Sequence, residues 1–180
     1  MRPVRRESGA PLAVVGRGGT MTAGLLRRLT GCPVEELTPC QAALTAPAGN
    51  RYRAVIVENF EPRDHRTLSC CAAARWALAP RADVTVVALD DAEGRRLATA
   101  LPGPVYAYSD GRPQANLTAK NVRLWDDRLE FDALTDGELL RVRLPLEDRP
   151  RLYDCLAALA GALALGVPLE RAARLLAHRG

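Results

Sequence analysis

Short apolar runs alternate with amphipathic segments along the first part of the chain. The apolar runs are rich in Val and Ala, and they cover residues 12–15, 54–57, 84–88 and 105–108. The segments between them have helical spacing over residues 22–29, 66–78 and 92–100. Short continuous apolar runs are typical of strands buried on both faces, and strands separated by helices favour a parallel sheet with crossover helices.

The pattern changes after about residue 117. Apolar and polar residues alternate in three further segments, which cover residues 118–125, 128–135 and 139–144. The dipeptides Asp126-Asp127 and Asp136-Gly137 join these segments, and such dipeptides suit tight hairpin turns. We therefore expect an antiparallel meander.

Two helices are expected at the end of the chain, over about 152–165 and 169–177, with a break at 166–168. The first has apolar residues on nearly every face, so it is either a core helix that covers the sheet or, if part of it is left bare, an interface. Together these elements predict an α/β fold: a mostly parallel sheet flanked by helices, with a small antiparallel meander.

The length of 180 residues suits one domain. We expect an N-terminal tail over residues 1–11 and a single domain over 12–180. Hydrophobic residues make up 48% of the chain but aromatic residues only 4%, so the core must be built from Ala, Leu and Val.

Charge and cysteine content exclude several classes of protein. Basic residues outnumber acidic ones by 25 to 21, but the two are interleaved, so nucleic acid is not an expected partner. The five cysteines form no Cys-x-x-Cys pair, which argues against a metal or disulfide framework. The N-terminus lacks the apolar core of a signal peptide, and the longest apolar run, near 156–167, is too short to span a bilayer. We expect a cytoplasmic protein with no membrane partner.

A glycine-rich loop joins the first apolar run to the first helix and is the main candidate site. Its candidate phosphate-binding residues are Gly16, Arg17, Gly18, Gly19, Thr20 and Thr22. Glycines let backbone N–H groups turn toward phosphate, a helix N-terminus receives the charge, and a lysine reaches the β and γ oxygens. This loop has no lysine, and Gly19 stands where the lysine is expected. The alternative interpretation is a strand-to-helix turn retained for packing.

Asp64 and His65, together with Glu58, form a second candidate cluster. Carboxylate oxygens and imidazole nitrogens suit Mg²⁺ or Mn²⁺, so these residues are candidates for a relic metal site. The alternative is a polar loop in which Asp64 caps the helix that begins at residue 66. We favour this alternative and predict no metal site. Asp90-Asp91 is likewise interpreted as a helix cap and first-turn acid.

Several strings of residues resemble the central, ATP-binding domain of the Mur ligase family, and most closely its muramoyl-tripeptide branch. The most specific strings are Thr-Ala-Lys-Asn-Val-Arg-Leu over 118–124, Leu-Glu-Phe-Asp over 129–132, Val-Arg-Leu-Pro-Leu over 142–146, Tyr-Asp-Cys-Leu-Ala-Ala over 153–158 and Ala-Leu-Gly-Val-Pro-Leu-Glu over 164–170. Asp90-Asp91 is similar to the family's Asn-Ala-Asp-Asp string. Asn-Phe-Glu-Pro-Arg-Asp-His over 59–65 is similar to its Thr-Asn-x-x-x-Asp-His string.

The resemblance covers roughly residues 12–177 in a shortened form. It implies the fold of a family whose members join an amino acid or amine to a carboxylate in peptidoglycan precursor synthesis, using ATP and Mg²⁺. Full family members also have an N-terminal substrate domain and a C-terminal domain that closes over ATP, and neither fits within these 180 residues.

The chain departs from the family pattern at residues that would carry the chemistry. Gly19 replaces the lysine of the loop. Arg75 stands in the place of the lysine that the family carbamylates to hold a second Mg²⁺, and a guanidinium cannot become that carboxylate-like ligand. Arg151 and Asp154 stand where the family's asparagines flank the nucleotide, which makes Asp154 a further candidate nucleotide-site residue. Together these departures predict that the ligase reaction is lost.

Two functional hypotheses follow. The first is a non-catalytic Mur-ligase-like domain without a cofactor, which binds a protein partner such as a cell-wall ligase or a second copy of itself, or binds a cell-wall precursor or nucleotide. The alternative is an active ATP-dependent amide ligase that uses ATP and Mg²⁺, or one subunit of such a ligase completed by a partner.

Overall fold

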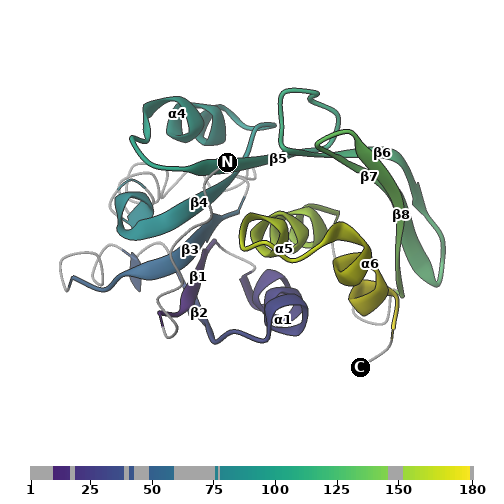
Figure 1. The fold of residues 1–180 in the computed structure, drawn as a ribbon, viewed down its shortest axis with the longest axis horizontal. Coiled ribbons are helices and arrows are strands. Elements are labelled where there is room, and N and C mark those ends of the chain that lie inside the picture. The colour runs from purple at the N-terminus through teal and green to yellow at the C-terminus, as the bar shows by residue number, and fades with distance from the viewer. Residues whose placement is uncertain are drawn as a thin grey trace.

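The computed structural model describes residues 10–16, 19–38, 41–42, 49–58, 76, 78–145 and 152–178. Eight strands form one sheet in the order β2-β1-β3-β4-β5-β6-β7-β8 (Figure 1). Their bounds are β1 Leu12–Val15, β2 Val34–Leu37, β3 Tyr52–Val57, β4 Ala82–Ala88, β5 Val105–Ser109, β6 Leu117–Leu124, β7 Arg128–Thr135 and β8 Glu138–Pro145. The pairs from β2 to β6 are parallel, and the β6/β7 and β7/β8 pairs are antiparallel. The predicted α/β fold with its meander is confirmed.

Helices cover both faces of the parallel part of the sheet. They are α1 Gly19–Thr30, α4 Ala92–Ala100, α5 Leu152–Ala164 and α6 Leu169–Ala177, with a short 3₁₀ turn at Ala79–Arg81. α1, α5 and α6 lie on one side of the sheet and α4 on the other (Figure 1). Because both faces are buried, consecutive strand residues are both apolar: Ile56 packs toward α1 and α5, whereas Val55 packs toward α4.

The helix α5 is a core element, as one of the two sequence interpretations proposed. All residues from Cys155 to Ala162 are buried. At Gly161 the helix comes so close to its neighbours that a Cβ atom would lie 3.0 Å from Leu26 Cδ1 and 3.2 Å from Ile56 Cγ1. Close packing of small residues, rather than large aromatic ones, therefore holds the helical layer on the sheet. The longest described helix, α5, has 13 residues, and the described part of the chain contains no helix with the length and apolar content that a membrane span requires.

Strand β2 is the element that the sequence pattern missed. Its residues Val34–Leu37 include two exposed glutamates and pair in parallel with β1 at the edge of the sheet. An edge strand that is half exposed has no continuous apolar run to reveal it. The helix predicted from residue 22 begins at Gly19 instead, and the helix predicted over 66–78 lies almost wholly outside the described residues.

The meander continues the parallel sheet through β6, which pairs with β5. The predicted turn at Asp136-Gly137 is confirmed, because both residues have positive φ angles, of 46° and 84°. β6 carries an irregularity between Lys120 and Arg123, where Asn121 has a φ of 52° and donates a hydrogen bond to Asp132 Oδ2 at 2.7 Å. The inward residues of the meander join the core beneath α5 and α6.

Asp132 makes the stability of the meander depend on pH. Hydrogen bonds from Arg141 and then from Asn121 lower the pKa of Asp132 from 3.8 to about 2. The native state thus favours the carboxylate, and this contribution is complete above the unfolded pKa and lost as the pH falls from about 4 to about 2. We expect thermal melts between pH 7 and 2 to show a steeper fall of Tm below pH 4 in the wild type than in Asp132→Asn.

The matched control for this prediction is Asp126→Asn at the exposed hairpin turn, which should follow the wild-type curve. Parallel Tm curves for the wild type and Asp132→Asn would show that the carboxylate is not stabilised by its partners.

Candidate functional site

The glycine-rich loop lies where the parallel strands end. The carboxyl ends of β1, β3, β4 and β5 meet at one edge of the sheet, since these strands are parallel neighbours. Ligand sites in open α/β sheets are found outside this edge. Gly16 follows β1 directly and is buried, and α1 begins at Gly19. The loop therefore has the strand-to-helix geometry that the sequence predicted.

The side chain of Glu58 closes on this loop from the neighbouring strand. Glu58 follows β3, and its backbone N–H donates to Val15 O at 3.1 Å. Its carboxylate is almost fully buried, and Thr22 Oγ1 donates to Glu58 Oε1 at 2.6 Å. Thr22 is itself fully buried in the first turns of α1. A hydrogen bond to a carboxylate is among the stronger ones in proteins, so this contact joins β3 to α1 beneath the loop.

Gly16 makes room for the Glu58 carboxylate. A Cβ atom at residue 16 would fall 1.9 Å from Glu58 Oε2 and 2.8 Å from Glu58 Cβ. Only glycine permits this approach, because a methyl group would overlap both atoms. Packing against Glu58 thus accounts for one of the loop glycines without any bound phosphate, which supports the interpretation of the loop as a structural turn.

The structure describes only some of the other predicted loop residues. Thr20 is exposed in the first turn of α1, beside Gly19. Arg17 and Gly18 lie outside the described residues. Glu58 brings Gly16 and Thr22 together, but Thr20 takes no part in that contact. Phosphate binding by these residues stays a prediction.

Asp90 and Asp91, at the end of β4, have separate roles. Asp91 is the N-cap of α4, as predicted, and accepts a hydrogen bond from Gly94 N at 2.6 Å. Asp90 does not take part in the cap, contrary to the expectation for the pair. Its carboxylate accepts from Ser109 Oγ at 2.7 Å and from Asp110 N at 3.0 Å, because it is turned toward the end of β5. Asp90 therefore ties two strand ends together.

The carboxylates of Asp90 and Asp110 lie near each other at this edge of the sheet, and Arg112 Nε lies 4.0 Å from Asp90 Oδ1. Burial raises the pKa of Asp110, and the nearby Asp90 raises it further. Burial also raises the pKa of Tyr153 to about 12, with the carboxylates of Asp90 and Asp110 adding to the effect. Tyr153 lies in the first turn of α5 next to the predicted nucleotide-site residue Asp154, which is half-buried. Such carboxylates repel a polyphosphate wherever no cation compensates them.

The described residues contain no group of three or more His, Cys, Asp or Glu side chains placed to hold a metal ion. Asp64, His65, Arg75 and Arg151 lie outside the described residues. The relic metal site and the substituted lysine therefore stay predictions.

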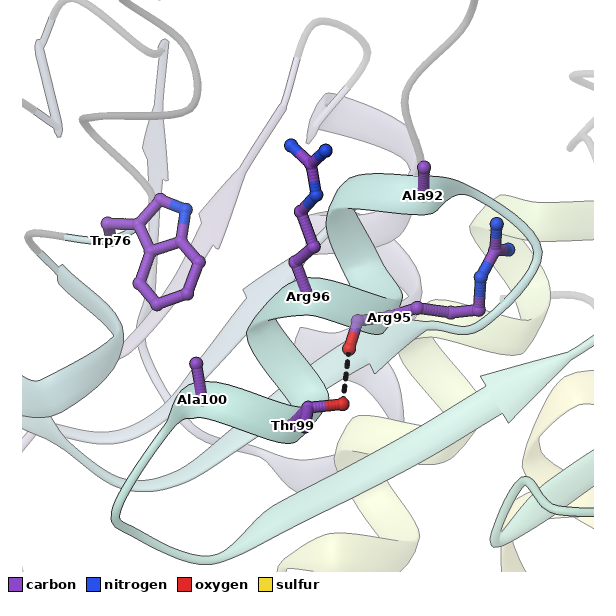
Figure 2. A pocket seen from close by; sticks show the side chains of 6 residues that line it. All are labelled: Trp76, Ala92, Arg95, Arg96, Thr99 and Ala100. Atoms are coloured by element: carbon purple, nitrogen blue, oxygen red, sulfur yellow. Dashed lines mark hydrogen bonds between the residues drawn. The ribbon is translucent and has the colours of Figure 1, made fainter.

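An open hollow lies on the exposed side of α4. It is lined by Trp76, Ala92, Arg95, Arg96, Thr99 and Ala100 (Figure 2). Its polar side chains are engaged within the protein: Arg95 donates to Leu89 O and Asp90 O, Arg96 pairs with Glu93 at 2.6 Å, and Thr99 donates to Arg95 O. The hollow consequently offers an indole ring and alkyl surface but no group prepared for catalysis.

Sequence reasoning did not anticipate the contact between Glu58 and the loop. The sequence suggests Glu58 only as a metal ligand beside Asp64 and His65, whereas its carboxylate is turned to Thr22 and Gly16. A signal was present, because Glu58 directly follows the apolar run at 54–57 and the ends of adjacent parallel strands must meet. The contact with Thr22 required the order of the strands in the sheet.

No protein-family model matches the sequence, and a search of curated proteins finds no significant relative. Solved structures do match. UDP-N-acetylmuramoylalanyl-D-glutamyl-2,6-diaminopimelate--D-alanyl-D-alanyl ligase from Acinetobacter baumannii aligns with a TM-score of 0.79 and 18% identity, over 97% of this chain and 47% of that one. UDP-N-acetylmuramoyl-L-alanyl-D-glutamate--2,6-diaminopimelate ligase aligns with a TM-score of 0.78 and 16% identity, over 99% and 48%. A pseudomurein peptide ligase type C from Methanothermus fervidus aligns with a TM-score of 0.72 and 13% identity, over 96% and 50%.

These matches define the class of fold to which the chain is similar. Its neighbours are Mur ligases and a pseudomurein peptide ligase, and the mostly parallel eight-stranded sheet with its meander is shared with them. The chain spans about half the length of these structures. At such low identity the likeness extends to the fold alone, and the resemblance inferred from the sequence strings is confirmed at that level.

Proposed function

We propose that this chain is a non-catalytic Mur-ligase-like domain that acts by binding a protein or ligand in peptidoglycan metabolism, in the cytoplasm. The observation that carries the proposal is the Glu58 carboxylate, which fills the space beside Gly16 and accepts the Thr22 hydroxyl. The space beside the strand-to-helix loop is thus occupied by a carboxyl group of the protein itself.

Electrostatics explains why this arrangement opposes phosphate transfer. Two like unit charges about 4 Å apart repel by about 4 kcal/mol at the effective dielectric constant typical of protein surfaces. A phosphate at the loop would meet the Glu58 carboxyl group, and Asp90, which pairs with Arg112, and Asp110 lie along the same edge. The loop also lacks the lysine that would offset this repulsion. Phosphoryl transfer depends on positive charge around the transferred group, so the arrangement supports binding without turnover.

The substitutions identified from the family resemblance point in the same direction. Gly19 and Arg75 stand at the positions expected for two lysines, and Asp154 adds a carboxylate near the expected nucleotide. Each replaces a group that would neutralise or hold the phosphates or Mg²⁺. A domain that keeps the fold but carries these changes is suited to binding.

The alternative function is an ATP-dependent amide ligase, or one subunit of such a ligase completed by a partner that supplies the missing cations. It is favoured by the similar structures, which are ligases, and by the near-complete coverage of this chain in the alignments. In that case ATP and Mg²⁺ would be bound at the loop.

Calorimetric titration and phosphate release separate the two functions. We expect the wild type to show no saturable binding of ATP with Mg²⁺ or of inorganic phosphate at millimolar concentration, and no phosphate release above a Thr20→Ala control. Glu58→Gln keeps the size of the side chain but removes its charge, so it should raise phosphate affinity by about tenfold or more.

Lysine variants provide the positive comparison. Gly19→Lys and Thr20→Lys place a cation in the first turn of α1, and each is combined with Glu58→Gln and Arg75→Lys. A gain of nucleotide binding in these variants and its absence in the wild type support the proposal. Wild-type ATP hydrolysis above the Thr20→Ala control would overturn it in favour of the ligase.

A further inference from the structure

One face of the meander is left uncovered by the described helices. β6, β7 and β8 curve around α5 and α6, which lie on the concave side (Figure 1). The residues that point to this side are buried in the core, among them Phe131 and Val142. Because side chains alternate along a strand, the residues between them point to the convex side. We call that side the convex face and define it by Lys120, Arg123, Glu130, Asp132, Leu134, Leu139, Arg141 and Arg143.

The strand register arranges the charges of this face in two rows. Asp132 pairs with Lys120 on β6 and Arg141 on β8, and Glu130 pairs with Arg123 and Arg143. Residues directly opposite each other in antiparallel strands share a face, so each row places a carboxylate between two cations.

Within each row the carboxylate is buried and the arginine side chains are exposed. Asp132 and Glu130 are buried, whereas the Arg143 side chain is 63% exposed and that of Arg141 43%. Arg141 binds Asp132 through Nε at 2.7 Å and Nη2 at 3.1 Å. A guanidinium has five N–H donors, so Arg141 keeps others for a second carboxylate.

The residues that define the convex face carry a positive charge. Its four cations and two carboxylates leave a charge of +2, which is half of the +4 of the whole chain. The register of three strands therefore brings four of the basic residues onto one face. Arg128 stands at the hairpin end of the same strands, where it pairs with Asp127 and with Glu130.

Exposed apolar side chains occur in the meander that carries these rows. Among the described residues, all the large hydrophobic side chains that are exposed belong to the meander: Val122, Leu124, Trp125 and Leu139. Leu139 is 59% exposed at one end, next to Leu134, and Trp125 is 46% exposed at the hairpin end, where Arg128 lies 5.0 Å from its ring centre. Aromatic and arginine side chains with apolar neighbours are the residue types that dominate protein interfaces.

We propose that the convex face binds an extended acidic segment of a partner protein, in which carboxylates alternate with apolar side chains. The proposal rests on the binding function proposed above and names its partner chemistry. Projecting guanidinium groups take up the carboxylates, and Trp125 and Leu139 anchor the apolar residues at either end.

Charge distinguishes this occupant from two others. A second copy would bring one positive face against another, which is unfavourable across an interface. A nucleic acid strand running along the middle strand would pass over Glu130 and Asp132, whose carboxylates repel phosphate. An acidic peptide can direct its carboxylates to the flanking arginines and its apolar side chains to Trp125 and Leu139, away from Glu130 and Asp132.

The probe for the test is a synthetic 12-residue peptide that repeats Glu-Leu-Glu-Ser three times. Its controls are the same peptide with Lys in place of Glu, and a 12-nucleotide oligouridylate. Binding is followed by amide chemical shifts of the ¹⁵N-labelled protein at two salt concentrations. We expect the acidic peptide to shift resonances of β6, β7 and β8, with an affinity that falls as salt is raised.

Charge-reversal variants test whether the peptide binds at the convex face. Arg123→Glu with Arg143→Glu is expected to weaken peptide binding by about tenfold or more. The matched control reverses two other exposed arginines, Arg51 and Arg96, which form ion pairs outside the meander. It should bind as the wild type does, with both variants checked for folding by circular dichroism.

Four results would overturn the proposal: no shifts at millimolar peptide, equal weakening in the control variant, tighter binding of the oligouridylate, or a dimer that Arg123→Glu with Arg143→Glu dissociates. These results do not contradict the proposed function if the wild type neither binds nor hydrolyses ATP. Wild-type ATP hydrolysis removes the proposed function whatever the peptide does, so the two failures are distinguishable.

Discussion

Replacement of Gly94 by alanine is expected to lower the free energy of unfolding by about 3 kcal/mol. Gly94 lies in the first turn of α4, where the helix packs on β4. A Cβ atom there would fall 1.8 Å from Ala88 O, a backbone atom that cannot rotate away. The helix would have to lift from the sheet or shift along it, and either movement disturbs the Asp91 cap that binds Gly94 N at 2.6 Å.

Gly24→Ala is the matched control for this prediction. Gly24 is also helical and is exposed on α1, but a Cβ atom there meets nothing within 4 Å. The substitution should raise stability by about 0.5–1 kcal/mol, because alanine restricts the unfolded chain more than glycine does. Urea unfolding followed by circular dichroism measures both variants. Wild-type stability in Gly94→Ala would show that α4 does not pack this closely on β4.

A double-mutant cycle at Gly16 and Glu58 is expected to show a coupling of about 2 kcal/mol. Gly16→Ala alone should destabilise the protein strongly, because its Cβ atom would lie 1.9 Å from the buried Glu58 carboxylate. Glu58 cannot easily turn away, since Thr22 holds its Oε1 at 2.6 Å. In a Glu58→Ala background the carboxylate is absent, so the added methyl group should cost much less.

The rescue is expected to be partial. Glu58→Ala still has a Cβ atom, 2.8 Å from the position of the new methyl group. It also leaves the buried Thr22 hydroxyl without this acceptor, which costs about 1–3 kcal/mol in its own right. Gly24→Ala supplies the control, because it should show no coupling with Glu58→Ala. Additive effects at Gly16 and Glu58 would contradict the close contact and remove the main support for a loop occupied by its own carboxylate.

If this cycle and the phosphate titrations agree, the loop is better understood as part of the packing of β1, β3 and α1 than as a vacant nucleotide site. The fold of the similar ligases would then persist here with its loop closed by Glu58. Binding through another surface, such as the convex face, would provide the function without phosphoryl transfer.

Elements with a strong local pattern were predicted to within a residue or two. The predicted bounds of β1, β7, α4 and α6 agree with those observed, because apolar periodicity, hairpin dipeptides and a capping aspartate act over short stretches of chain. The Ala/Leu-rich helix α5 was predicted in place, but whether it was core or interface was decided by the burial of Cys155 to Ala162.

Strand β2 could not be predicted for the converse reason. Its sequence, Val-Glu-Glu-Leu, has no hydrophobic pattern that distinguishes a strand from a loop. It becomes a strand because β1 offers an open edge with which to pair. The irregularity in β6 is similar, since the conformation of Asn121 depends on the register with β7.

The sequence by itself determined the fold class, most of the described elements other than β2, and the presence of a glycine-rich loop without lysine, because these features depend on residues that are neighbours along the chain. The tertiary structure alone decided what that loop contacts and which charged side chains share a face. Glu58 and Thr22 are 36 residues apart, and the two charge rows join three strands. Such contacts depend on strand order and register, which local patterns do not specify.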